Sequence, residues 1–117
     1  MLVTQLIIDH DTQGTDYTPA SLGGDSANGV WKYVQGVRDQ NVLFVCHDTT
    51  RSETFTAEIQ GSIDGGVQWH VIGELVNADF DSGGGAWLEV PAFPLMRAKY
   101  DYASGSAAHV FNAFIIE

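Results

Sequence analysis

Short blocks in which apolar and polar residues alternate recur along the chain. In the clearest block, Glu53–Gly61, Phe55, Ala57 and Ile59 alternate with polar side chains. A period of two predicts a β-strand with one buried face and one solvent-exposed face. The same reasoning predicts further strands at Leu2–Asp9, Gly29–Gly36, Gln40–Asp48, Val67–Leu75, Ala86–Val90, Met96–Ala103 and Ala107–Ile116.

The segments between these blocks are rich in residues that form turns. Asp64-Gly65 predicts a hairpin, because glycine tolerates the positive φ that tight hairpins need. Pro91 and Pro94 interrupt strand pairing, because proline has no amide hydrogen to donate. Helix signals are weak, so the chain is expected to be all-β.

About seven to nine short strands in a chain of this length predict a two-sheet antiparallel sandwich or a jelly roll. We expect a single β-sandwich domain over residues 1–117, with core strands over 37–117. Residues 1–36 are expected to form a loop-rich entry or irregular arm, in which Asp11–Asn28 is a long surface loop with one short strand near Asp16–Ala20. Val42–Cys46 is apolar throughout, which predicts a strand covered on both faces. The expected core consists of Leu6, Ile8, Trp31, Phe44, Phe55, Ile59, Trp69, Val71, Leu88, Tyr100, Val110 and Phe114.

The charge balance narrows the range of partners. The chain has 15 acidic and 5 basic residues, a formal net charge of −10. This balance argues against nucleic acid and against an anionic membrane surface, because both ligands require clustered Lys and Arg. The charge is also uneven: Asp9, Asp11, Asp16 and Asp25 all precede Lys32, the first basic residue. We expect this acidic arm to contact another protein.

Arg97 and Lys99 are two residues apart on a predicted strand and therefore face the same side. They are expected to pair with acidic side chains, either on a neighbouring strand or on a neighbouring subunit. With the four arm aspartates, they make up the candidate interaction residues.

Two segments have oxygen ligands at spacings that invite a metal hypothesis. Asn77, Asp79 and Asp81 match the start of a calcium loop, but Ser82 and Leu88 occupy the positions where an EF-hand has Gly and Glu. A different calcium site and a solvated acidic loop both remain open there. Asp9-His10-Asp11 could offer oxygen and nitrogen ligands to a metal, but a strand end followed by a turn explains the triplet equally well. We therefore expect no metal and no cofactor.

Catalytic patterns are missing from the sequence. It contains no Gly-x-Ser-x-Gly elbow, no phosphate-binding glycine loop and no His-Glu-x-x-His. Glu58 and Glu74 resemble a glycosidase pair only in residue type, and alternation on solvent-exposed strand faces explains both. Cys46, the single cysteine, is expected to be a reduced core thiol. We expect a protein that is not an enzyme.

The segment Ser62–Trp69 resembles the Asp-box, Ser-x-Asp-x-Gly-x-x-Trp, of sialidases and related propellers. The matching residues are Ser62, Asp64, Gly66 and Trp69. In that family the box is a structural hairpin remote from catalysis, and the resemblance implies the same role here. A sugar-contact role is the alternative.

A wider resemblance covers residues 37–117. The segments that carry it, in order, are Thr54–Ile59, Gly61–Trp69, Pro94–Ala98 and the Ser104-Gly105 turn before a final strand. This order is similar to small β-sandwich virion proteins of tailed bacteriophages, such as capsid decoration (cement) proteins.

The virion resemblance implies a location and partners. The expected location is the capsid surface of a virion assembled in the host cytoplasm, which agrees with the lack of a visible secretory signal. The expected partners are the major capsid protein and copies of the chain itself, in a homotrimer. A tail or neck adaptor is a variant of the same hypothesis.

The main alternative is a carbohydrate-binding β-sandwich module. Flat aromatic rings stack on pyranose faces, so an exposed group of aromatics would indicate it. The candidate sugar contacts are Trp31, Tyr33, Trp87, Phe93 and Tyr102.

Overall fold

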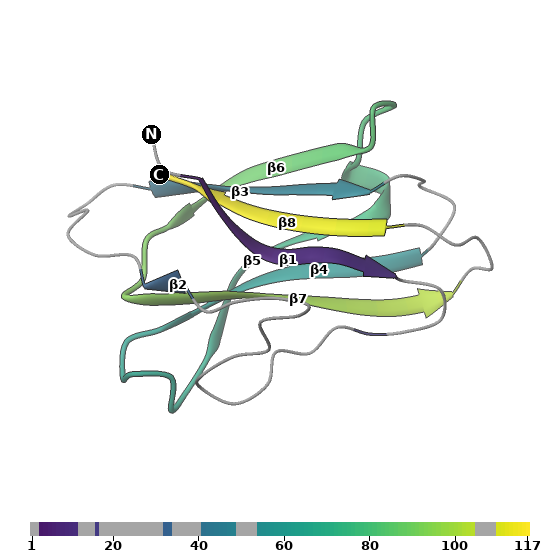
Figure 1. Cartoon of the computed structure of the whole chain (residues 1–117). Helices are drawn as coiled ribbons and strands as arrows, with labels where there is room; N and C mark the ends of the chain where they lie inside the picture. The colour runs from purple at the N-terminus through teal and green to yellow at the C-terminus, as the bar shows by residue number, and fades with distance from the viewer. Residues whose placement is uncertain (1–2, 12–15, 17–31, 34–40, 49–53, 105–109) are drawn as a thin grey trace.

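The computed structural model describes residues 3–11, 16, 32–33, 41–48, 54–104 and 110–117 (Figure 1). Strands make up most of this part of the chain, with one short 3₁₀ turn, η1, at Asn77–Asp79. The strands are β1 (Val3–Asp11), β2 (Lys32–Tyr33), β3 (Asn41–Asp48), β4 (Thr54–Ser62), β5 (His70–Val76), β6 (Gly85–Pro91), β7 (Leu95–Ser104) and β8 (Val110–Ile116).

These strands form two sheets, which lie as two layers in Figure 1. The first sheet has the order β1-β8-β3-β6 and the second has the order β2-β7-β4-β5. The strand pairs are antiparallel in both sheets. The prediction of an all-β, two-sheet antiparallel sandwich is therefore confirmed.

The core lies between the two sheets and is centred on four aromatic rings. Phe55 of β4 stacks on Tyr100 of β7, with ring centroids 5.1 Å apart. Phe111 of β8 meets Phe55 edge to face, with ring centroids 5.8 Å apart. Phe80, which follows η1, also meets Phe55 edge to face, with ring centroids 5.2 Å apart. Burying each large apolar side chain of this kind contributes about 1.5–3 kcal/mol. The cluster joins the sheets because Phe111 belongs to the first sheet and Phe55 to the second.

Strand β5 departs from the prediction for Val67–Leu75. It begins at His70, and Val67 and Val71 are 79% and 54% exposed. A register shift between Ile59 and Gln60 places Val71 opposite Gln60. This bulge interrupts the alternation, so Ile72 packs against the core while Val71 faces solvent.

Other members of the expected core lie elsewhere. Trp69 is only partly buried, beside Arg97, so its assignment to the core is wrong. Phe114 and Val110 alternate with the buried Phe111, Ala113 and Ile115, and therefore face outward. The confirmed core members are Leu6, Phe44, Phe55, Ile59 and Tyr100, with Leu88 packed against them.

Some predictions fall on parts of the chain that the structure does not describe. These are Trp31, the side chain of Ile8, most of Gly29–Gly36, and the strand near Asp16–Ala20 apart from Asp16 itself.

Candidate functional site

The hairpin between β4 and β5 is organised around the hydroxyl of Ser62. This hydroxyl donates to Asp64 Oδ1 at 2.8 Å and accepts from the backbone N–H of Gly66 at 2.9 Å. Asp64 Oδ1 also accepts from the backbone N–H of Gln68 at 3.0 Å. Gly65 and Gly66 have φ values of 75° and 92°, which glycine adopts without strain. The residues that match the Asp-box therefore bind one another and shape the turn.

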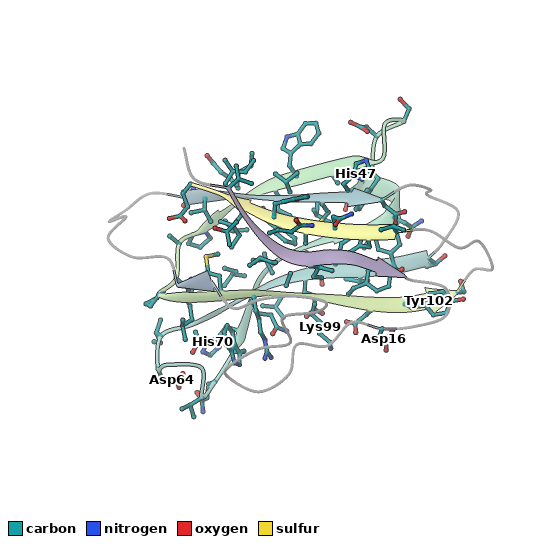
Figure 2. All side chains as sticks on the ribbon, viewed as in Figure 1. Asp16, His47, Asp64, His70, Lys99 and Tyr102 are labelled. Atoms are coloured by element: carbon teal, nitrogen blue, oxygen red, sulfur yellow. The ribbon has the colours of Figure 1, made fainter. Side chains whose placement is uncertain are left out.

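These hydrogen bonds also set the charge state of Asp64. The Gln68 amide, and next the Ser62 hydroxyl, lower the pKa of its carboxyl group, because they stabilise the ionised form. Asp64 lies at the projecting tip of the hairpin in Figure 2. Ile63 and Val67 in the same turn are 72% and 79% exposed. The tip is therefore a constrained loop that presents two aliphatic side chains to solvent.

Trp69 closes the hairpin and connects it to β7. Its Nε1 donates to the carbonyl of Gly66 at 3.1 Å. The guanidinium carbon of Arg97 lies 4.3 Å from the centroid of its ring, within the range of a cation–π contact. The fourth residue of the motif thus contacts the turn and the neighbouring strand.

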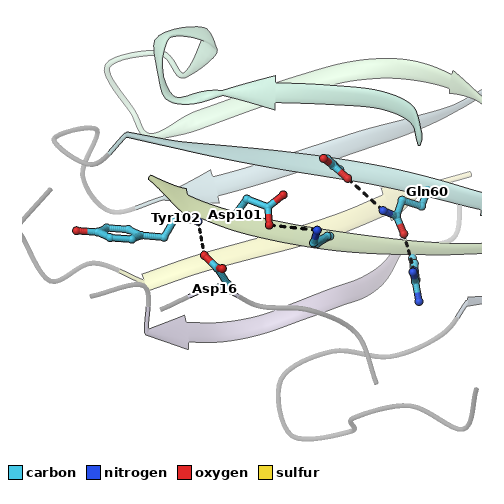
Figure 3. Close-up of polar contacts among 7 residues, drawn as sticks. Asp16, Gln60, Asp101 and Tyr102 are labelled. Atoms are coloured by element: carbon cyan, nitrogen blue, oxygen red, sulfur yellow. Dashed lines mark hydrogen bonds and ion pairs between the residues drawn. The ribbon is translucent and has the colours of Figure 1, made fainter. Parts of the chain in front are cut away.

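Arg97 and Lys99 belong to a row of polar side chains on the outer face of the second sheet (Figure 3). Arg97 Nε donates to Gln60 Oε1 at 2.6 Å, and Gln60 Nε2 donates to Glu58 Oε2 at 3.1 Å. Lys99 Nζ lies 3.3 Å from Asp101 Oδ1 on the same strand. Both basic residues thus have partners within their own chain.

Glu58 and Glu74 face each other across the β4–β5 pair. Glu58 also lies opposite Lys99 and accepts a hydrogen bond from Gln60. The structure therefore places the two glutamates on the outer face of the second sheet, within a row of polar side chains.

Asp16 is the arm aspartate whose contact the structure describes. Its Oδ1 accepts from the backbone N–H of Tyr102 at 2.7 Å, at the edge of β7 (Figure 3). Strand β2 pairs with β7 only at Leu95 and Met96, so Asp16 occupies a more distant part of that edge. Asp9 and Asp11 lie in β1, but their side chains and the whole of Asp25 are outside the described residues.

The acidic residues of the loop after β5 are hydrogen-bond acceptors for its backbone. Asp79 Oδ2 accepts from Val76 N–H at 2.8 Å. Asp81 Oδ1 accepts from Gly83 and Gly85 N–H at 2.8 and 3.0 Å. Within the described part of the chain, no three His, Cys, Asp or Glu residues gather as a metal site. The backbone of the loop thus supplies hydrogen-bond donors to both aspartates.

Cys46 lies on the inner face of β3 and is fully buried. Burial raises the pKa of its thiol well above the ordinary value, and the nearby charge of Asp48 raises it further. A thiol held in the protonated form is a poor nucleophile. The expected core thiol matches this environment.

The candidate sugar contacts do not converge. Trp87 of β6 is 61% exposed on the outer face of the first sheet. Phe93 and Tyr102 are partly buried and pack against the core instead. The side chains of Trp31 and Tyr33 are not among the described ones.

The outer face of the first sheet is the surface that the sequence analysis missed. A row of outward residues runs across all four strands: Gln5, Phe114, Val45 and Trp87 are successive partners. The next row consists of Val3, Ile116, Leu43 and Glu89. We call the row of Gln5, Phe114, Val45 and Trp87 the central row. The apolar face comprises Val3, Leu43, Val45, Trp87, Phe114 and Ile116.

The six members of the apolar face differ in their exposure, and few charged side chains are described beside them. Val3 is 55% exposed, Trp87 is 61% exposed, and the other four members are half-buried among one another. None of the described elements packs over it. Glu89 is the only carboxylate among the outward side chains that the structure describes on the strands of this sheet. The expectation that Val42–Cys46 is covered on both faces is confirmed on the inner side, which the second sheet covers. On the outer side Leu43 and Val45 are half-buried, and no described element packs over them.

Comparison of the chain with family models, with curated proteins and with solved structures found no match. The described residues include no helix that is long and apolar enough to cross a bilayer. The function must therefore be argued from the surfaces themselves.

Proposed function

We propose that this chain is a non-enzymatic structural protein of a phage virion that decorates the capsid. The observation that carries the proposal is the apolar face. The largest exposed apolar patch on a soluble protein is often a site of protein–protein contact. The resemblance of residues 37–117 to virion proteins is the reason for proposing the capsid as the partner. On the described surfaces, no group of side chains favours catalysis over binding.

The rest of the fold suits a binding scaffold. Two antiparallel sheets around an aromatic core form a rigid body that presents flat faces and loop tips. The hairpin tip, with Ile63 and Val67, provides a second, smaller apolar contact at one end. The proposed partners are the major capsid protein and further copies of the chain. The proposed location is the outer surface of the head.

Asp16 changes the part assigned to the acidic arm. Its carboxylate accepts from β7 of its own sandwich, so this residue contacts its own domain. Arg97 and Lys99 likewise have intrachain partners. We therefore place the capsid contact on the apolar face and the hairpin tip.

The test is the composition of purified virions from a phage that encodes the chain. Mass spectrometry should detect the protein in the particle, and cryo-electron microscopy should locate it on the head. Trp87→Ala should reduce its incorporation. A protein missing from the particles would refute the proposal, and density at the tail or neck would reassign the protein to an adaptor role.

Trp87 also keeps the carbohydrate-binding hypothesis open, because one exposed indole on a flat sheet is the minimum that a sugar platform requires. A glycan array with the wild type and Trp87→Ala tests it. Binding that depends on Trp87 would support the module, and an array without any bound glycan would exclude it for the glycans tested.

A further inference from the structure

The turn of the β4–β5 hairpin contains the only Asp-Gly dipeptide of the sequence, Asp64-Gly65. In such a pair the backbone nitrogen of the glycine is a near neighbour of the aspartate carboxyl carbon, and no Cβ shields it. Both residues are exposed at the hairpin tip (Figure 2), and a Cβ built on Gly65 would meet no atom within 4 Å. The dipeptide is therefore accessible to water on its outer side.

An Asp-Gly pair can isomerise with water as its only reagent. The Gly65 nitrogen attacks Cγ of Asp64, a C–N bond forms, and the amide proton leaves with the carboxyl hydroxyl as water. Water then adds to the backbone carbonyl carbon of Asp64 in the cyclic imide and breaks the bond of that carbon to the Gly65 nitrogen. The product is isoaspartate, in which the main chain runs through Cβ and Cγ and the carboxylate is on Cα. Mass and charge are unchanged.

The hairpin holds the reacting carboxyl group in place. Asp64 Oδ1 accepts from Ser62 Oγ at 2.8 Å and from the Gln68 backbone N–H at 3.0 Å. The buried Ser62 hydroxyl also accepts from Gly66 N–H at 2.9 Å, on the far side of the dipeptide. Ring closure joins Cγ to the Gly65 nitrogen and removes one carboxyl oxygen, so the contacts that fix this group must loosen first.

The same contacts keep the carboxyl group in its less reactive form. A neutral carboxylic acid can lose its hydroxyl as water, whereas a carboxylate has no hydroxyl to lose. The Gln68 amide, and next the Ser62 hydroxyl, lower the pKa of Asp64. At neutral pH the neutral acid is therefore rarer here than in an unstructured Asp-Gly pair.

We propose that Asp64-Gly65 is a site of spontaneous aspartate isomerisation, which the hydrogen bonds from Ser62 and Gln68 keep slow in the folded chain. The proposal does not rest on the proposed function, because it concerns the chemistry of the hairpin tip wherever the protein acts. Isoaspartate lengthens the main chain of the turn by a methylene group and moves the carboxylate away from the Gln68 N–H. The modified hairpin therefore cannot re-form its native hydrogen bonds.

The first experiment follows the full chain at neutral pH for several weeks. Peptide mapping locates isoaspartate, and an isoaspartate methyltransferase quantifies it. Because hydrogen bonds to a charged group must open first, the folded protein should isomerise at Asp64 about tenfold or more slowly than the chain unfolded in guanidinium. Deamidation at Asn28-Gly29 changes the mass and is thereby distinguished from this reaction. Equal rates in the folded and unfolded chain would overturn the proposal.

A second experiment separates the turn from global stability. Ser62→Ala removes one donor to Asp64 and should raise the isomerisation rate of the folded protein about fivefold or more. Val42→Ala is the control, because it removes buried methyl groups in the first sheet and leaves the hairpin intact. Its rate should stay within about twofold of the wild-type rate, since local opening of the hairpin is unaffected. Equal acceleration in both variants would show that global unfolding governs the reaction, and would contradict the role of the hairpin hydrogen bonds.

A third variant checks the site itself, even where Ser62→Ala fails to fold. Gly65→Ala places a methyl group beside the attacking nitrogen, so isoaspartate at Asp64 should be largely lost from the chain unfolded in guanidinium. The folded state plays no part in this comparison. Undiminished isoaspartate in Gly65→Ala would refute the assignment of the reaction to this dipeptide.

Discussion

The guanidinium of Arg97 lies over the ring of Trp69, 4.3 Å from its centroid, and ties the β4–β5 hairpin to β7. The same guanidinium donates through Nε to Gln60 Oε1 at 2.6 Å. One side chain therefore holds the hairpin base and the middle of the second sheet together. The contact lies on the sheet's outer face, away from the aromatic core, so its contribution to stability can be tested separately from core packing.

Arg97→Ala is expected to destabilise the fold by about 1–2 kcal/mol, because it removes a cation–π contact, a hydrogen bond and the packing of the aliphatic stem on Trp69. Urea denaturation measures the change. Lys99→Ala is the control on the same face: it removes an exposed ion pair with Asp101 and should cost less than about 1 kcal/mol. Equal losses in the two variants would contradict the role assigned to Arg97.

Ser62→Ala should destabilise the protein by about 1–3 kcal/mol, since the Ser62 side chain is fully buried and its hydroxyl serves both Asp64 and Gly66. Denaturant melts of this variant can be compared with those of Ser82→Ala, which removes an exposed hydroxyl in another turn. A neutral Ser62→Ala would show that the hairpin forms without this hydroxyl.

The pKa of Asp64 is lowered in the folded state, so ionised Asp64 favours folding. This contribution is fully present above the ordinary carboxyl pKa of 3.8 and is lost as the pH falls through the lower folded value. The difference in unfolding free energy between wild type and Asp64→Asn should therefore shrink as the pH is lowered from about 5 to about 2. A difference that stays constant over this range would exclude a lowered pKa.

Gly84→Ala is expected to be strongly destabilising, by about 3 kcal/mol or more. Its φ of 82° is unfavourable for alanine, and the added Cβ would overlap the carbonyl oxygen of Asp48. Asp48 also donates its backbone N–H to Gly84 O at 2.8 Å, so the two backbone segments cannot move apart freely. Gly65→Ala is the control, because its φ is 75° but its Cβ would meet open space. It should cost only about 1 kcal/mol in thermal or denaturant melts.

Cys46 should resist thiol reagents in the native protein and react only on unfolding, because it is buried and its pKa is raised. Labelling by an aromatic disulfide at mildly alkaline pH, with and without denaturant, measures this. Fast labelling of the folded chain would show that the first sheet opens readily.

Local sequence was enough to predict the fold class and the hairpin. Alternation at Phe55, Ala57 and Ile59 correctly identified a strand and its buried face, because a strand's side chains alternate regardless of what lies above it. The mutual contacts of Ser62, Asp64 and Gly66 are equally local, since all three lie within one turn.

Only the tertiary structure determined which faces are covered. Val42–Cys46 is apolar on both sides, so alternation alone cannot distinguish its buried side from its open one. The packing of the two sheets buries Phe44 and leaves Val45 in the central row beside Trp87. A bulge in β5 likewise reversed the side on which Val71 lies. These outcomes depend on register and on layer packing between distant segments, and no short window of sequence contains that information.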